Sequence, residues 1–186
     1  MGMPQPAERW TADLVRSLPD DGQRYELISG TLVVTPAPRW THQFVVGALH
    51  LRLHEWLGEH HDLTVVFSPA DISLGEDEIL QPDLFVVRSA PGEPVREWSD
   101  VRELALVIEV LSPSTAHYDR NLKRKRYQRA AVPEYWIVDS DARQIERWRP
   151  GDDAPEVLTD RLTWQPSEGG PVHELDLGTF FSTLNA

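Results

Sequence analysis

A single glutamate lies inside one of the most apolar stretches of this chain. The stretch Leu104–Leu111 contains Glu109 among leucine, valine, isoleucine and alanine residues. Runs this rich in branched apolar residues predict a mostly buried β-strand. Alternation along a strand places Glu109 on the same face as Ala105, Val107 and Leu111. Because a buried carboxylate is costly unless it is paired, protonated or bound to a metal, Glu109 marks the first place to look for chemistry.

A second apolar run precedes it and opens with another acidic residue. Asp83 follows Pro82 and directly precedes the run Leu84–Val87. If both runs form neighbouring strands, Asp83 and Glu109 belong to one site. The alternative for Asp83 is a turn acid that follows proline.

The charge of the chain is strongly acidic but unevenly distributed. The 30 acidic residues outnumber the 18 basic residues and give a net charge of −12, which argues against a general nucleic-acid coat protein. Six of the 18 basic residues nevertheless lie within the ten residues 120–129. One basic helix on an acidic body suits a localised anionic ligand, although a solvated helix face is the simpler explanation.

Other features of the composition restrict the class of protein. The chain has no cysteine, which excludes disulfides and thiolate zinc sites. No apolar run approaches the roughly 18 residues that a membrane span needs. Residues 1–9 lack the basic-then-apolar layout of a signal peptide, so we expect a flexible leader and a cytoplasmic protein.

The remaining chain, residues 10–186, is expected to form a single domain of mixed α/β (α+β) class. The pattern predicts helices over 10–18 and 41–57 and a hairpin over 25–34. It predicts a strand over 65–74, broken at Pro69, before the two central strands. A basic helix over 119–131 and a strand over 134–139 follow these. Short strands and turns are expected over 144–149, 156–164 and 172–181.

Four sequence blocks resemble the signature blocks of one bacterial family. They are Arg24–Gly30 (RYELISG), Gln81–Asp83 (QPD), Ile108–Thr115 (IEVLSPST) and Val132–Asp139 (VPEYWIVD). The family is the putative restriction endonuclease family, also called domain of unknown function 820 or Uma-two, of the PD-(D/E)XK nuclease superfamily. The resemblance extends from about Trp10 to Phe181. It implies a restriction-endonuclease-like core: a mixed central sheet flanked by helices, with an added N-terminal hairpin and C-terminal strands.

The resemblance also implies an activity, a metal and a set of site residues. Asp83 and Glu109 would bind Mg²⁺, with Mn²⁺ as a possible substitute, for hydrolysis of DNA phosphodiester bonds. Glu26 would be a further acid of the site, reaching in from the hairpin. Its alternative is a strand carboxylate that faces solvent. A homodimer is expected, because two sites naturally serve the two strands of a duplex.

One departure from the superfamily pattern concerns its lysine. The pattern has Glu-x-Lys in the third core strand, but Leu111 stands two residues after Glu109. The chain has only two lysines, Lys123 and Lys125, both on the predicted basic helix. Helical spacing places Lys123 with Tyr127 on the face toward the sheet, so Lys123 is our candidate for a relocated catalytic lysine. The alternative is a lysine that merely extends over the sheet edge.

Two classes of function therefore stand open. One is a magnesium-dependent endonuclease with Glu26, Asp83, Glu109 and Lys123 as catalytic residues. The other is a catalytically inactive binding or structural module that keeps the nuclease fold, which the acidic charge and the missing Glu-x-Lys both allow. His42, near the start of the first long helix, is a second-tier candidate at the border of the cleft.

Overall fold

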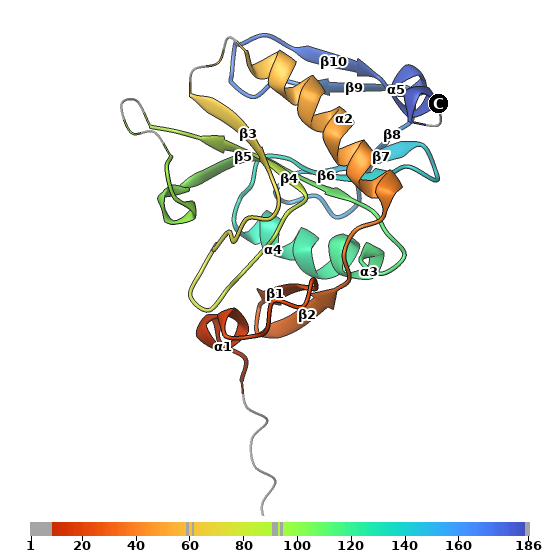
Figure 1. The fold of residues 1–186 in the computed structure, drawn as a ribbon. Helices are drawn as coiled ribbons and strands as arrows, with labels where there is room; N and C mark the ends of the chain where they lie inside the picture. The colour runs from red at the N-terminus through yellow and green to blue at the C-terminus, as the bar shows by residue number, and fades with distance from the viewer. Residues whose placement is uncertain (1–8, 59, 61, 91–92, 94, 185–186) are drawn as a thin grey trace, which may run out of the picture.

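The computed structural model describes residues 9–58, 60, 62–90, 93 and 95–184. Its centre is a six-stranded sheet with the strand order β3-β4-β5-β6-β7-β8 (Figure 1). These strands are β3 Leu63–Phe67, β4 Leu84–Arg88, β5 Glu103–Val110, β6 Tyr135–Asp139, β7 Gln144–Trp148 and β8 Glu156–Leu158. The sheet is mixed, because β5 and β6 run parallel and the other neighbouring strands run antiparallel.

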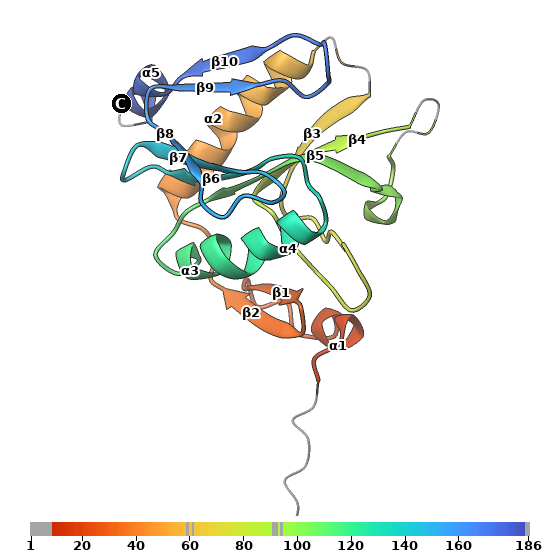
Figure 2. The ribbon, with the colours of Figure 1, turned by 180° about the vertical axis from the view of Figure 1, so that it is seen from behind.

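A helical crossover connects the parallel strands β5 and β6. It consists of α3 Ala116–Tyr118, the π-helical turn η2 Asp119–Lys123 and α4 Arg124–Arg129. The crossover covers one face of the sheet, as both views show (Figures 1 and 2). Tyr127 is fully buried there, with its ring 5.0 Å from that of Tyr135 on β6. This packing fixes the side of the crossover that faces the strands.

The opposite face of the sheet is covered by α2 Trp40–Leu57 and by C-terminal elements. The latter are the antiparallel pair β9 Arg161–Trp164 and β10 His173–Asp176, followed by α5 Leu177–Thr183. Five residues of α2 are buried: Val45, Val46, Leu49, Leu53 and Leu57. They belong to the larger of two main cores, which also includes Ile108 and Val110 of β5. The sheet thus separates two apolar layers.

The N-terminal part of the chain lies beyond the crossover. It contains α1 Ala12–Arg16 and the hairpin of β1 Arg24–Ile28 and β2 Thr31–Thr35 (Figure 2). Ser29 and Gly30 both have positive φ, at 51° and 80°, as expected for a two-residue turn that matches the strand twist. Leu27 and Ile79 exchange two backbone hydrogen bonds of 2.9 Å, which tie the hairpin to the segment before β4.

The mixed α+β class, the central sheet and its flanking helices are confirmed, but three details were wrong. A bulge between Val86 and Val87 of β4 leaves Ala105 without a partner in the β4–β5 register. Ala105 therefore packs in the core that contains Ile108, on the face opposite to Glu109 and Val107. Local pattern reading cannot detect such a bulge, because it assumes strict alternation.

The other two corrections concern predicted strands. Residues 70–74 do not form a strand, since only Ile72 makes an isolated bridge, to Leu80. Over 172–181 a short strand is present, but Asp176 then begins a helix by accepting a 2.7 Å hydrogen bond from the Thr179 amide. An aspartate that caps the first turn favours helix over strand.

Two further expectations concern the whole chain. Residues 1–8 of the expected flexible leader lie outside the described residues, and a single domain over 10–186 stays a prediction. In the described part of the chain, no helix combines the length and the apolar character that crossing a bilayer requires.

Candidate active site

Lys123 lies in a buried cluster of carboxyl groups between the sheet and the helical crossover. Its Nζ donates a 2.9 Å hydrogen bond to Glu109 Oε1 on β5. The same Nζ lies 3.0 Å from Glu26 Oε1 on β1 and 3.8 Å from Asp119 Oδ1. Each of these four side chains is at most 3 % exposed. The N-terminal hairpin, the central strand and the crossover therefore meet at one ammonium group.

The π-helical turn explains how the crossover supplies two of these groups. Asp119 and Lys123 are the first and last residues of this turn, and both are buried. Turns of this kind are rare and occur frequently at functional sites. Among the described residues, none donates a hydrogen bond of good geometry to either carboxylate oxygen of Asp119. Asp119 therefore brings a buried carboxylate into the site, and the charge of Lys123 and the side chain of Thr115 favour its ionised form.

Asp83 joins the cluster from the start of β4 and is held by three donors. Its Oδ1 accepts a 2.8 Å hydrogen bond from Arg24 Nη1, and its Oδ2 lies 3.0 Å from His42 Nε2. Oδ2 also accepts a 2.9 Å hydrogen bond from the Val110 amide, adjacent to Glu109. The two acids on neighbouring strands are thus brought to the same edge of the sheet.

The residue before Pro82 links Asp83 to the hairpin. The backbone amide of Gln81 donates a 2.7 Å hydrogen bond to Glu26 Oε1, the oxygen that also faces Lys123. The guanidinium of Arg24 spans the same region, since it contacts Asp83 and the Gln81 carbonyl. The Gln-Pro-Asp block therefore positions the site through its backbone as well as through Asp83.

The environment moves the pKa values of the buried acids in opposite directions. Burial raises the pKa of Glu109 well above its usual value; Lys123 opposes this shift, and the charge of Asp83 adds to it. Burial also acts to raise the pKa of Asp83, but the hydrogen bond and charge of His42, together with Arg24, hold it well below its usual value. Burial raises the pKa of Asp119 to about 6.

The ammonium of Lys123 stays protonated in this setting. Burial alone would lower its pKa, but the charges of Glu109, Glu26 and Asp119 more than offset burial and raise the pKa well above its usual value. Four buried acids therefore face the cations Lys123 and Arg24 and the ring of His42. This excess of acidic groups favours either a bound proton or an added cation.

Asp119→Asn should stabilise the metal-free protein at neutral pH. An acid whose pKa is raised in the folded state stabilises the fold only while it is protonated. Its contribution to the free energy of unfolding is therefore lost as pH rises from about 4 to about 6. A pKa near 6 instead of 3.8 corresponds to about 3 kcal/mol. Urea unfolding in chelator should show the variant more stable at pH 7.5 by about 2–3 kcal/mol, with little difference near pH 4.

The matched control for this experiment is Asp141→Asn, at an exposed position. It should change the free energy of unfolding by less than about 0.5 kcal/mol at either pH. If Asp119→Asn were less stable than the wild type at pH 7.5, this would contradict the inferred excess of acidic groups in the buried cluster.

The donor set fits a hard divalent cation. Mg²⁺ takes oxygen ligands and usually only one or two protein carboxylates. Asp83 and Glu109 supply two, and the carboxylate of Asp119 lies in the same cluster. Among the described residues, no three acidic or histidine side chains form a ready-made metal centre. Asp83 and Glu109 instead contact cationic side chains, which a metal ion would have to displace or share.

The structure brings together all four residues that the sequence pointed to. Glu26 faces the site rather than solvent, and Lys123 rather than the exposed Lys125 enters it. His42 also contacts the site. Sequence reasoning missed Arg24 and Asp119. Each had a signal, because Arg24 opens the RYELISG block and Asp119 lies one helical turn before Lys123.

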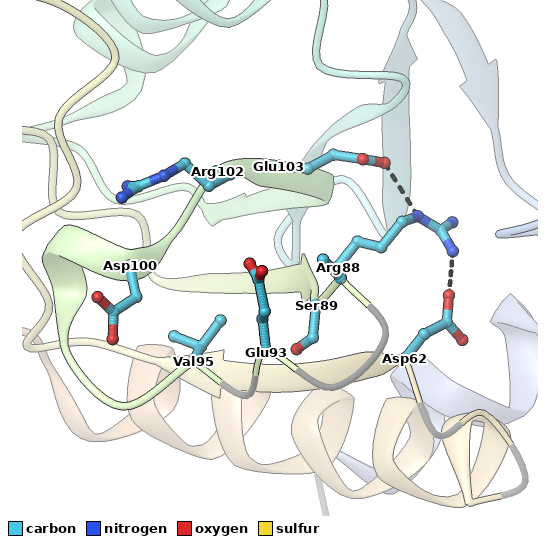
Figure 3. A pocket seen from close by; sticks show the side chains of 9 residues that line it. Asp62, Arg88, Ser89, Glu93, Val95, Asp100, Arg102 and Glu103 are labelled. Carbon is cyan, nitrogen blue, oxygen red and sulfur yellow. Dashed lines mark hydrogen bonds and ion pairs between the residues drawn. The ribbon is translucent and has the colours of Figure 1, made fainter.

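A separate cavity of about 580 Å³ lies at the other end of β4 and β5 (Figure 3). Arg88 donates a 2.9 Å hydrogen bond to Glu103 there and also contacts Asp62. It donates a further hydrogen bond of 2.8 Å to the Pro166 carbonyl. These bonds clamp the sheet edge to the C-terminal part of the chain, so we assign this cavity a structural role.

A mixed sheet with helices on both faces and acids on adjacent strands defines a restriction-endonuclease-like fold. The chain belongs to the Uma2 family, described as "Putative restriction endonuclease", whose family model matches residues 12–180. A solved structure of "a putative nuclease belonging to DUF820" from Anabaena variabilis is similar, with a TM-score of 0.76 and 18 % sequence identity. That similarity covers 94 % of this chain and 98 % of the other. A search of curated proteins finds no match.

Proposed function

We propose that this protein is a magnesium-dependent DNA endonuclease that hydrolyses phosphodiester bonds. The observation that carries the proposal is the buried contact of Lys123 with Glu109 and Glu26, beside Asp83. A lysine is costly to bury and is kept charged here by its acidic neighbours. Membership of the putative restriction endonuclease family supports the same activity.

The chain's residues divide into metal ligands and charge-bearing groups. We propose that Asp83 and Glu109 hold Mg²⁺, or Mn²⁺ in its place. A bound metal of this kind polarises the phosphate and lowers the pKa of a coordinated water. In the hydrolysis, the water oxygen bonds to phosphorus while a phosphorus–oxygen ester bond breaks, and the leaving oxygen takes up a proton.

Lys123 acts in this proposal as a fixed positive charge. Because its pKa is raised, the ammonium is a hydrogen-bond donor and not a base. It offsets the negative charge that develops on the phosphate and orients the attacking water. Glu26 holds Lys123 in place, since its Oε1 is itself fixed by the Gln81 amide. Arg24 and His42 keep Asp83 ionised.

The proposed substrate is DNA, and the proposed assembly is a homodimer. Two sites would allow cleavage of both strands of a duplex. The net charge of −12 limits the number of phosphate contacts, so the affinity for DNA should be modest and should decrease with salt less steeply than that of a protein with many such contacts.

A second candidate function is an inactive module with a nuclease fold. The observation that favours it is the pairing of both proposed ligands with cations, Asp83 with Arg24 and Glu109 with Lys123. Such pairs could persist as a purely structural network. The two candidates differ in whether the site binds a divalent metal.

Calorimetry with magnesium distinguishes the endonuclease from the inactive module. The wild type should bind Mg²⁺, and Asp83→Ala or Glu109→Ala should abolish the binding signal, because each removes one of the two proposed carboxylate ligands. Glu103→Ala is the matched control, since Glu103 lies on the same strand as Glu109 but pairs with Arg88 at the other end of that strand. Undiminished binding in either of the first two variants would remove the metal assignment.

A further inference from the structure

An apolar cavity of about 710 Å³ opens next to Asp83. One wall is α2, which contributes Phe44, Gly47 and Leu51, and the other includes Phe67 at the end of β3. Arg24 and Asp83 also line the cavity, so it is continuous with the candidate active site. Its volume lies within the roughly 300–1,000 Å³ of ordinary ligand pockets.

The cavity exposes aromatic side chains to solvent. Phe44 is 45 % exposed and Phe67 is 52 % exposed, and Leu51, which also lines the cavity, is 65 % exposed. The ring of His50 meets the Phe67 ring edge-on at a distance of 5.0 Å. A contiguous apolar surface of this kind marks a binding site more often than a chance exposure.

We propose that this cavity receives an unpaired nucleobase of the substrate strand, beside the phosphate that a metal ion bound by Asp83 and Glu109 would contact. The proposal rests on the proposed nuclease function and names its substrate class as single-stranded or locally unpaired DNA. Every base has an aromatic face that can stack on Phe44 or Phe67, whereas a base within a duplex is already stacked and cannot enter. One or two stacked bases also suit an acidic protein, which lacks the basic surface for a long duplex footprint.

Gly47 offers a way to block the cavity without disturbing the fold. It lies within α2, and a Cβ added there meets no atom within 4 Å. In Gly47→Leu the new side chain therefore occupies open space in the cavity, and leucine favours a helix more than glycine does. Phe44→Leu is the second variant, because it keeps the apolar bulk and removes the aromatic face. Trp98→Leu removes an aromatic side chain of similar exposure, 42 %, that does not line the cavity.

The test is fluorescence anisotropy with a labelled 12-nucleotide strand and with the same strand in a blunt duplex, both in chelator so that no cleavage occurs. The wild type should bind the single strand more tightly than the duplex. Gly47→Leu and Phe44→Leu should each weaken binding of the single strand about 5- to 100-fold, the scale of losing a base–aromatic stack. Trp98→Leu should change it less than twofold.

Abasic substitutions moved along the strand test whether a base is the group that enters. For the wild type, an abasic site at one or two positions should weaken strand binding about as much as Gly47→Leu weakens binding of the intact strand. The affinity of Gly47→Leu itself should fall little further when the intact strand is replaced by that abasic strand. Wild-type binding by Gly47→Leu, equal affinity for strand and duplex, or no strand binding at all would each overturn the proposal.

A second copy of the chain is the competing occupant of the cavity. In that case Gly47→Leu would convert a wild-type dimer into a monomer in sedimentation experiments and leave strand binding unchanged, which would also overturn the proposal. Because binding is measured without metal, the proposed function can fail on cleavage alone while the nucleobase site stands. Conversely, active cleavage with wild-type strand binding by Gly47→Leu would remove only the nucleobase site.

Discussion

Asp83→Ala and Glu109→Ala should each reduce magnesium-dependent DNA cleavage by about a thousandfold or more, the scale of losing a group of the reacting centre. Each variant removes one of the two carboxylates proposed to hold the metal. The loss should appear in single-turnover rates at saturating DNA, because the chemical step and not DNA binding is affected. This is the largest effect that the site geometry predicts.

The control for these variants is again Glu103→Ala, whose carboxylate belongs to the clamp at the far end of β5. Its cleavage rate should stay within about twofold of the wild type. Glu109→Ala leaves Lys123 paired with Glu26, so the variant should remain folded, as circular dichroism can verify. Full activity of Asp83→Ala would show that catalysis occurs elsewhere or without this pair.

Lys123→Ala should lower the cleavage rate by about a hundredfold or more while magnesium affinity stays nearly intact. The ammonium stabilises charge on the phosphate but is not a metal ligand in our proposal. The same substitution should cost about 3–5 kcal/mol of stability, because it leaves Glu26, Glu109 and Asp119 buried without their shared cation. Urea unfolding measures the second effect, and rates should be compared under conditions where the variant is folded.

Lys125→Ala is the natural control for Lys123, because Lys125 is exposed on the same helix. It should change DNA affinity modestly and the chemical step hardly at all. Lys123→Arg should not restore the rate, since a planar guanidinium does not fit the fully buried position of a compact ammonium. Equal losses for both lysines, or rescue by arginine, would reduce the helix to a basic patch and favour the inactive module.

The fold could be predicted largely because its core elements have strong local patterns. Hydrophobic patterns in the local sequence predict the apolar strands β4 and β5 and the long helix α2. The exceptions depend on contacts distant in sequence. The bulge that displaces Ala105 arises from pairing with β4, and Ile72 pairs with Leu80 in an isolated bridge. Neither contact can be read from a window of neighbouring residues.

The residues of the candidate site likewise include some that local sequence predicts and others that only distant contacts bring in. Glu109 could be predicted because a lone acid in an apolar strand requires a partner, and Lys123 because helical spacing turns it toward the sheet. The contacts of Asp83 with Arg24 and His42 span 59 and 41 residues, so tertiary structure alone creates them. The π-helical turn that includes Asp119 is likewise not encoded by any simple repeat.

The most direct test of the proposed nuclease site is a magnesium titration of DNA cleavage by the wild-type protein, with single-stranded, duplex and partly unpaired substrates in parallel. A nuclease site built on these residues should give no cleavage in chelator, cleavage that rises with magnesium and saturates, and loss of that cleavage in Glu109→Ala. Cleavage that persists in chelator, or no cleavage of any substrate at saturating magnesium, would contradict the claim that the buried acids and Lys123 form a nuclease site.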